Sequence, residues 1–139
     1  MNTAFNYKTL IPFRFTDFDT FGHANNAVYL TYFEIARSNY WREVIHWDWK
    51  SLGIIIANAE ITYIKPVHQS DQLFAYVRTS YVGNTSFKLE YILVKLIHGV
   101  EEICTKGSTV CVAYDYKTQQ KVSIPDYQRA KMLEFEALV

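Results

Sequence analysis

The chain has 139 residues and a formal net charge of zero, because 14 Lys and Arg balance 14 Asp and Glu. This length suits one globular domain, so residues 1–139 are interpreted as a single unit. Half of the residues are hydrophobic and 17% are aromatic, which excludes a disordered chain, and the neutral charge argues against a dedicated nucleic-acid binder.

No targeting segment is expected. The first residues lack the basic and apolar regions of a signal peptide, and the longest aliphatic run, residues 54–57, is far shorter than the roughly 20 residues that cross a bilayer. Cys104 and Cys111 fall in one predicted strand, too far apart to form a disulfide with each other. We therefore expect a cytoplasmic protein with buried, reduced cysteines and no membrane span.

The N-terminal third predicts a strand, a loop and a long helix. The strand is expected at residues 9–15, with Pro12 indicating a sheet edge or the start of a strand, and the polar residues 16–26 form the loop. Asn26 is predicted as the helix N-cap. Apolar residues then recur every three or four positions and predict a helix buried over much of its circumference: Tyr29, Tyr32, Phe33, Ala36, Tyr40 and Val44.

The rest of the chain predicts four long antiparallel strands and a short terminal helix. Alternating apolar residues place the strands at about residues 55–63, 73–82, 87–97 and 103–114. The alternation slips near Tyr91 and Ile92, which indicates either a bulge or burial of both faces of that strand. The helix is expected from about Pro125 to Ala137. One wide apolar helix beside one long sheet indicates an α+β fold with the helix across the concave face of the sheet.

The loop before the long helix carries the candidate chemistry. Asp19 lies seven residues before the predicted cap, and the first amides of a helix are unpaired and carry partial positive charge. Such amides can polarise a carbonyl while a nearby carboxylate attacks it or activates a water, which suits acyl transfer. Gly22 permits a close backbone approach. Asp, Gly and Asn are also ordinary turn residues, and Asp17 is interpreted as a hydrogen-bonding loop residue.

No metal site is predicted. His46, His68 and His98 are scattered, and the sequence has no HxxxH or CxxC spacing.

The same residues resemble a known family. The loop and helix together are similar to the signature of hotdog-fold acyl-CoA thioesterases of the 4-hydroxybenzoyl-CoA thioesterase type, and residues 61–66, 71–73, 82–87 and 124–125 match later segments of that family in order. The residues that carry the resemblance in the loop and helix are Asp17, Asp19, Gly22, His23, Asn25, Asn26, Tyr29, Tyr32, Phe33, Glu34, Ala36 and Arg37.

The resemblance implies a fold, an activity and a set of site residues. The fold is a hotdog, in which five or six antiparallel strands wrap a long central helix. The activity is hydrolysis of an acyl-CoA or carrier-protein thioester to a carboxylic acid and a thiol. Asp19 maps to the catalytic carboxylate, and the amide of Asn26 maps to the group that polarises the thioester carbonyl. The residues implied to bind substrate or order the loop are Gly22, His23, Asn25, Tyr29 and Ser86.

Coenzyme A enters as part of the substrate, and no separate cofactor is expected. Some relatives hold its nucleotide with paired arginines where this chain has Gly83 and Asn84. Lys65, Arg78 and Lys88 are alternative candidates for phosphate contacts. The other branch of the fold uses a glutamate within the helix, but Glu34 is interpreted here as a surface or interface ion pair.

Two other functions remain open at this point. A hotdog hydratase or dehydratase uses a catalytic histidine beside a carboxylate, which His23 near Asp19 imitates, although the longer His motifs of those enzymes are absent. A non-catalytic acyl-binding protein would keep the fold without turnover. For each function we expect a homodimer or homotetramer, because the family pairs its sheets and an exposed sheet edge is usually covered.

Overall fold

A computed structural model of the chain describes residues 4–138. Strands and helices follow one another along the chain with a short 3₁₀ turn at Phe15–Asp17 and a π-helical turn at Trp41–Ile45. The elements are β1 (Tyr7–Ile11), α1 (Val28–Tyr40), β2 (Gly53–Tyr63), β3 (Leu73–Val82), β4 (Ser86–Ile97), β5 (Val100–Asp115), β6 (Gln120–Lys121) and α2 (Asp126–Phe135).

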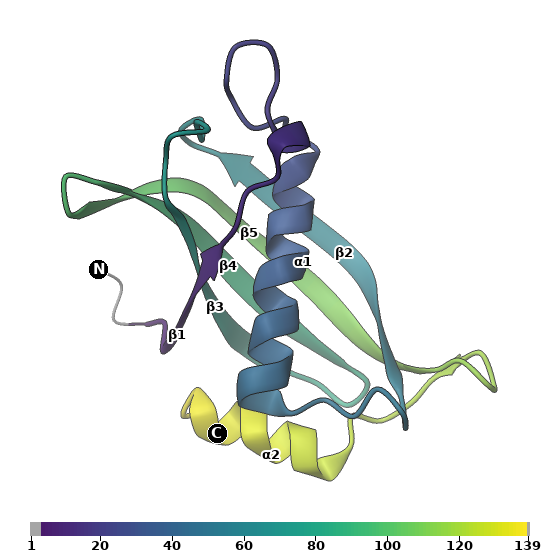
Figure 1. The fold of residues 1–139 in the computed structure, drawn as a ribbon. Helices are drawn as coiled ribbons and strands as arrows, with labels where there is room; N and C mark the ends of the chain where they lie inside the picture. The colour runs from purple at the N-terminus through teal and green to yellow at the C-terminus, as the bar shows by residue number, and fades with distance from the viewer. Residues whose placement is uncertain (1–3, 139) are drawn as a thin grey trace.

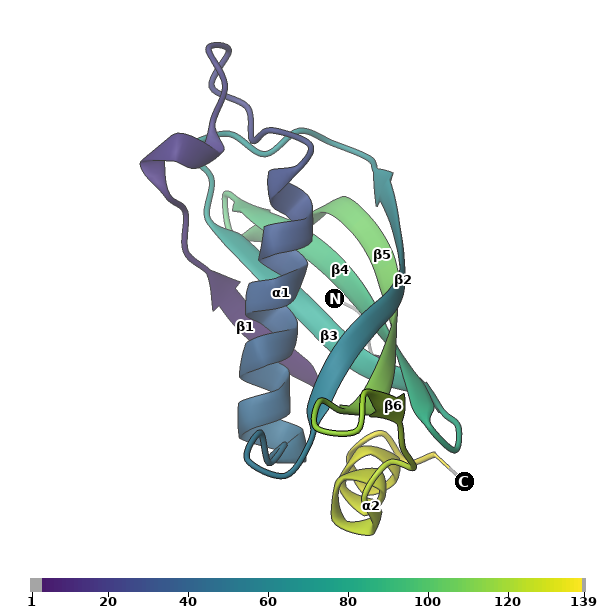
Figure 2. The same ribbon diagram turned by 90° about the vertical axis from the view of Figure 1, so that its right-hand side faces the viewer.

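One antiparallel sheet curls around α1 (Figures 1 and 2). Its order is β1-β3-β4-β5-β2, and β6 pairs with β5. The helix α2 packs at the C-terminal end of α1, and the loop that precedes α1 projects at the opposite end (Figure 1). The predicted α+β hotdog arrangement, a long helix wrapped by a six-stranded antiparallel sheet, is therefore confirmed. Within residues 4–138, no helix is both long and apolar enough to cross a membrane.

The structure corrects several local predictions. Asn26 is not the N-cap, because Ala27 holds that position and the Asn25 Oδ1 atom accepts a hydrogen bond from the Ala27 N–H (3.0 Å). The α-helical bonding ends at Tyr40, and the apolar periodicity continues through the π turn. The first strand ends at Ile11, because the proline that follows it cannot donate to a ladder. Sheet bulges lie at residues 56–58, 79–81 and 93–94.

The helix packs tightly against the sheet over Gly107 of β5. A Cβ atom at this position would lie 2.4 Å from the ring of Phe33 and 2.7 Å from the carbonyl oxygen of Glu60. Phe33 also stacks on Tyr91, the residue of β4 that pairs with Gly107, with ring centroids 4.4 Å apart. The missing side chain of Gly107 therefore leaves room for the Phe33 ring between α1 and the sheet.

We predict that Gly107→Ala lowers the free energy of unfolding by about 1–3 kcal/mol, because the added methyl group overpacks the contact with Phe33. Urea denaturation measures this change. Lys106→Ala is the control, since Lys106 is the exposed neighbour on the same strand and its truncation should change stability by less than about 0.5 kcal/mol. Equal stability of the two variants would contradict the prediction.

Candidate functional site

Most of the predicted site residues, although not Gly22 or Ser86, line one cavity of about 450 Å³ at the N-terminal end of α1. One wall is the loop of residues 19–26 together with the first turn of the helix, and we call it the first wall. The other wall, here called the second wall, is the segment 63–71 that follows β2. The cavity is lined by Asp19, His23, Ala24, Asn25, Asn26, Tyr29, Tyr63, Ile64, Lys65 and Pro66.

The carboxylate of Asp19 is exposed and has one oxygen committed to the loop. Its Oδ1 atom accepts hydrogen bonds from the N–H groups of Phe21 (2.9 Å) and His23 (3.1 Å). The turn is closed by a bond from the Gly22 N–H to the Asp19 carbonyl (3.0 Å), and Gly22 adopts a φ of 79° that favours glycine. Within residues 4–138, the Oδ2 atom accepts no hydrogen bond. One oxygen therefore orders the loop and the other faces no protein donor.

The backbone amide of Asn26 differs from its neighbours in its hydrogen bonding. The N–H groups of residues 25, 27, 28 and 29 all donate to protein acceptors, whereas the Asn26 N–H has no acceptor in the part of the chain that the structure describes. The Asn25 carbonyl of the same peptide unit accepts from the Val28 N–H (2.9 Å). In a trans peptide the N–H points opposite to the C=O, so this bond directs the Asn26 N–H away from the helix.

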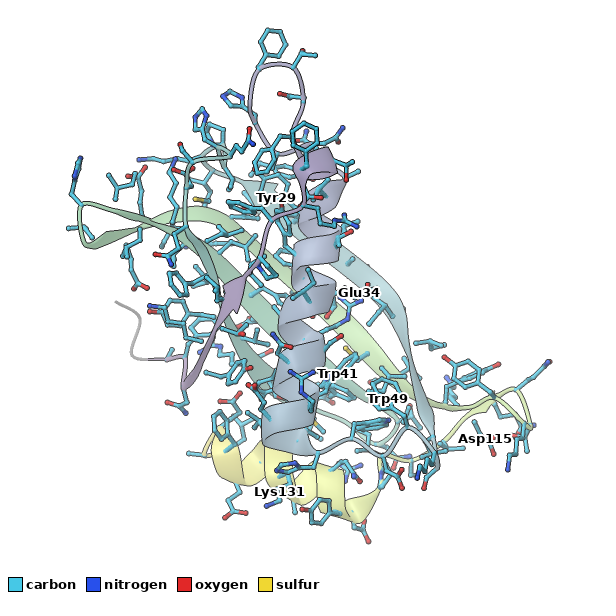
Figure 3. All side chains as sticks on the ribbon, in the orientation of Figure 1. Tyr29, Glu34, Trp41, Trp49, Asp115 and Lys131 are labelled. Carbon is cyan, nitrogen blue, oxygen red and sulfur yellow. The ribbon has the colours of Figure 1, made fainter. Side chains whose placement is uncertain are left out.

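Two tyrosines support the helix start. The Tyr63 hydroxyl donates to the Asn26 carbonyl (2.9 Å), and its ring meets the ring of Tyr29 edge-on with centroids 5.1 Å apart. Tyr29 is only 2% exposed, and its hydroxyl accepts the Val67 N–H (3.3 Å). Burial raises the pKa of the Tyr29 phenol, so this group stays protonated and neutral at physiological pH. Tyr29 lies near the top of α1 in Figure 3.

Asp17 is a structural residue, as its sequence context predicts. It is 1% exposed, and its carboxylate accepts hydrogen bonds from the N–H (2.9 Å) and Nε (2.9 Å) of Arg14 and from the Tyr32 hydroxyl (3.0 Å). Burial, together with this carboxylate, raises the pKa of Tyr32. The two aspartates of the loop therefore differ in environment, because one is buried and fully bonded and the other faces the cavity.

Other predicted residues lie elsewhere. Ser86 begins β4, nine residues from Lys95 and therefore about 30 Å along the strand from the end nearest the cavity. Arg78 pairs with Glu90 (2.5 Å), and both Arg78 and Lys88 lie on the sheet face opposite α1. Lys65 does line the cavity, where its Nζ lies 2.6 Å from a Glu102 oxygen.

Glu34 lies farther along α1, on the side toward β2 (Figure 3). Its side chain is 67% exposed and lies 3.8 Å from Arg37, which agrees with the interpretation as a surface ion pair.

Sequence reasoning missed most of the second wall. Ile64 and Pro66 line the cavity, and the ring of His68 meets the ring of His23 edge-on at 4.4 Å between centroids. The motif of residues 61–66 was visible as a match in the sequence, but nothing local indicates that it folds against the first wall. Within residues 4–138, no cluster of three or more His, Cys, Asp or Glu side chains is placed to hold a metal.

Comparisons with known proteins agree with this architecture. A model of the thioesterase-like superfamily matches residues 13–132. The YsmA protein of Bacillus subtilis is 30% identical over 132 residues, which cover 94% of this chain and 88% of that protein. A thioesterase of Thermus thermophilus, solved in complex with coenzyme A and Zn, is 29% identical with a TM-score of 0.84, and 99% of each chain is covered.

A more distant structure shares the fold. It is a variant of 4-hydroxybenzoyl-CoA thioesterase in complex with 4-hydroxybenzoyl-CoA, and it is 13% identical with a TM-score of 0.82, covering 91% of this chain and 97% of that one.

We predict that Asp17→Asn lowers the free energy of unfolding by about 2 kcal/mol or more, because a buried carboxylate loses its charge-assisted bonds to Arg14 and Tyr32. Asp19→Asn keeps an oxygen for the loop amides and should change stability by less than about 0.5 kcal/mol. Chemical denaturation of the two variants tests the contrast. A larger loss for Asp19→Asn would reverse the structural assignment.

Proposed function

Because the chain belongs to the thioesterase-like superfamily, we propose that it is an acyl-CoA thioesterase, which hydrolyses an acyl thioester to a free carboxylic acid and a thiol. The observation that carries the proposal is the pairing, at one cavity, of an unpaired helix-terminal amide at Asn26 and an exposed carboxylate at Asp19. The complex of the Thermus thermophilus thioesterase with coenzyme A supports coenzyme A as the acyl carrier. Coenzyme A is then part of the substrate.

The chemistry follows from where charge develops. As the thioester carbonyl is attacked, its oxygen gains negative charge, and the Asn26 N–H at the positive end of the α1 dipole stabilises it. Asp19 either attacks the carbonyl carbon or removes a proton from the attacking water. The C–S bond then breaks, and the thiolate leaves and takes up a proton. If Asp19 has attacked, a water molecule hydrolyses the resulting mixed anhydride, which releases the carboxylic acid and restores the Asp19 carboxylate. If Asp19 has acted as the base, the proton that it removed from water passes to the thiolate. The phenols of Tyr29 and Tyr63 shape the cavity around the reacting group.

The remaining predicted residues have supporting places. Gly22 and Asn25 hold the loop in shape, and His23 lines the cavity beside Asp19. Lys65 is the cation that lies at the cavity, and it is the proposed contact for a phosphate of coenzyme A or of a carrier-bound pantetheine arm. We place the reaction in the cytoplasm, where the two free, buried cysteines stay reduced.

We further propose that the active form is a homodimer or a homotetramer. Among the described strands, β2 pairs only with β5, so its other edge presents unpaired backbone groups, and Ile55 and Ile56 are more than one third exposed. The same strand ends at Tyr63 in the cavity. A second copy that pairs with this edge therefore lies beside the candidate site.

We predict that Asp19→Asn lowers the rate of acyl-CoA hydrolysis by a factor of about 10³ or more, because the proposed nucleophile or base is lost while the loop keeps its bonds. The measurement is thiol release from a panel of short, medium, long and aromatic acyl-CoAs. A parallel assay of enoyl-CoA hydration tests the hydratase alternative. Tight acyl-CoA binding without thiol release would favour a non-catalytic acyl-binding protein, and full activity of the variant would remove Asp19 from the mechanism.

The oligomer makes a separate prediction. Light scattering at micromolar concentration should give the mass of two or four chains. Ile56→Lys, on the β2 edge, should shift the mass toward a monomer and reduce hydrolysis, because a charge on an edge strand opposes pairing. Leu10→Lys is the control on the opposite edge strand β1, where the side chain is also exposed. A fully active monomeric wild type would contradict the proposed assembly.

A further inference from the structure

We propose that Lys95 of β4 is a positioning residue, which holds the second wall of the candidate site in place and, through that wall, the loop that carries Asp19. This inference rests on the proposed function for its catalytic consequence. Lys95 does not line the cavity, so it acts on the reaction through the backbone that it binds.

The side chain of Lys95 is a buried charge with apolar neighbours on β3 and β4 and with Glu102 opposite it on β5. It is 9% exposed and lies on the sheet face that packs toward α1, between buried residues that include Leu73 and Leu93. Burying an ammonium group is costly unless it is paired and hydrogen-bonded. An apolar side chain of similar size would avoid this cost. The bonds that the ammonium group forms therefore explain why a lysine occupies this buried position.

Both partners of Lys95 belong to the second wall. Its Nζ atom donates to the Pro66 carbonyl (3.0 Å) and lies 3.6 Å from the Oδ2 atom of Asp71. The same Asp71 oxygen accepts the N–H of His68 (2.7 Å). One ammonium group thus joins three points of the segment between residues 66 and 71. Pro66 lines the cavity directly, so its position determines the shape of the cavity.

The second wall in turn holds the first wall. The Ala24 N–H donates to the Val67 carbonyl (2.8 Å), and the Gln69 N–H donates to the Gly22 carbonyl (3.3 Å). His23 and His68 form an antiparallel bridge and meet ring to ring. His23 then connects to Asp19 through two bonds, from the Asp19 N–H to the His23 carbonyl (2.8 Å) and from the His23 N–H to the Asp19 carboxylate. A continuous series of contacts therefore connects Lys95 to Asp19 through the second wall and His23.

Asp17 and Lys95 are two buried charged residues, and each is bonded to a different wall of the cavity. Within residues 4–138 they are the charged residues that are buried. The ammonium group of Lys95 bonds the backbone of the second wall, and the main-chain carbonyl of Asp17 accepts the Asn25 N–H of the first wall (2.9 Å). The Asp17 carboxylate is itself held by Arg14 and Tyr32, which lie outside the first wall, and Lys95 holds the second wall through Pro66 and Asp71. Each wall is thus bonded to a residue whose charged side chain is buried.

The test compares hydrogen exchange and kinetics in four variants. Lys95→Met removes the charge and the bonds, Asp71→Asn removes the partner charge, and Lys95→Arg keeps a cation at the same position. Lys88→Met is the control, because Lys88 lies on the same strand but on the opposite sheet face. Exchange measured by mass spectrometry reports on residues 19–26 and 64–71 without requiring activity, and acyl-CoA hydrolysis separates kcat from KM.

We expect Lys95→Met to speed exchange about tenfold or more in both walls while the amides of β3, β4 and β5 stay protected. The kcat should fall about 10- to 100-fold with little change in KM, because displaced catalytic groups weaken the transition state more than binding. Asp71→Asn should act in the same direction, Lys95→Arg should restore at least part of both properties, and Lys88→Met should change neither.

Two results would overturn the proposal: unchanged exchange in residues 19–26, or a uniform loss of protection across the strands, which would show a merely structural role. If Lys95→Met does not fold, Asp71→Asn and Lys95→Arg decide between the same outcomes. If the wild type hydrolyses none of the acyl-CoAs, the proposed function fails, but the exchange measurement still tests the positioning role by itself.

Discussion

The bond between the Tyr32 hydroxyl and the buried carboxylate of Asp17 joins the candidate loop to the helix on which the fold is built. Tyr32 is fully buried in α1, so the loop that contains Asp17 is held at a point that the core itself fixes. From there, the Asn25 N–H donates to the Asp17 carbonyl (2.9 Å), and the Asn25 side chain bonds the Ala27 N–H. These bonds satisfy the groups near the start of the helix, and within residues 4–138 the Asn26 N–H is left without a protein acceptor.

Most polar groups of the loop have hydrogen-bond partners and only a few face the cavity, which suits an exposed loop to catalysis. A loop with many free polar groups would fluctuate and bind water in many arrangements, whereas here the neighbours of the free groups are paired. The Oδ1 atom of Asp19 accepts the hydrogen bonds that order the turn, and within residues 4–138 the Oδ2 atom accepts none. The electrostatic contribution of an amide or carboxylate to a transition state depends on its being held in place beforehand. The buried groups beneath the loop supply that restraint.

The fold and half of the site could be predicted from the sequence, because both depend on local patterns. Periodicity located α1 and the four long strands, and the first-wall residues from Asp19 to Tyr29 are close neighbours in the chain. The cap was misassigned because Asn25 and Asn26 are equally good capping residues, and only the backbone decides which side chain bonds to Ala27. Lys95 was visible as a charge in an apolar run, but its partner Pro66 lies 29 residues away, a separation that periodicity does not resolve.

The second wall also explains why the site lies where β2 ends. The Ile64 and Lys65 N–H groups both donate to the Cys104 carbonyl of β5 (2.8 and 3.0 Å), so the chain leaves the sheet at this point while still bonded to it. Tyr63, the last residue of β2, donates to the Asn26 carbonyl. The unpaired edge of the sheet and the start of α1 are therefore connected by one phenol. In the proposed dimer, a partner that paired with this edge would therefore lie one hydrogen bond from the peptide that follows the Asn26 amide.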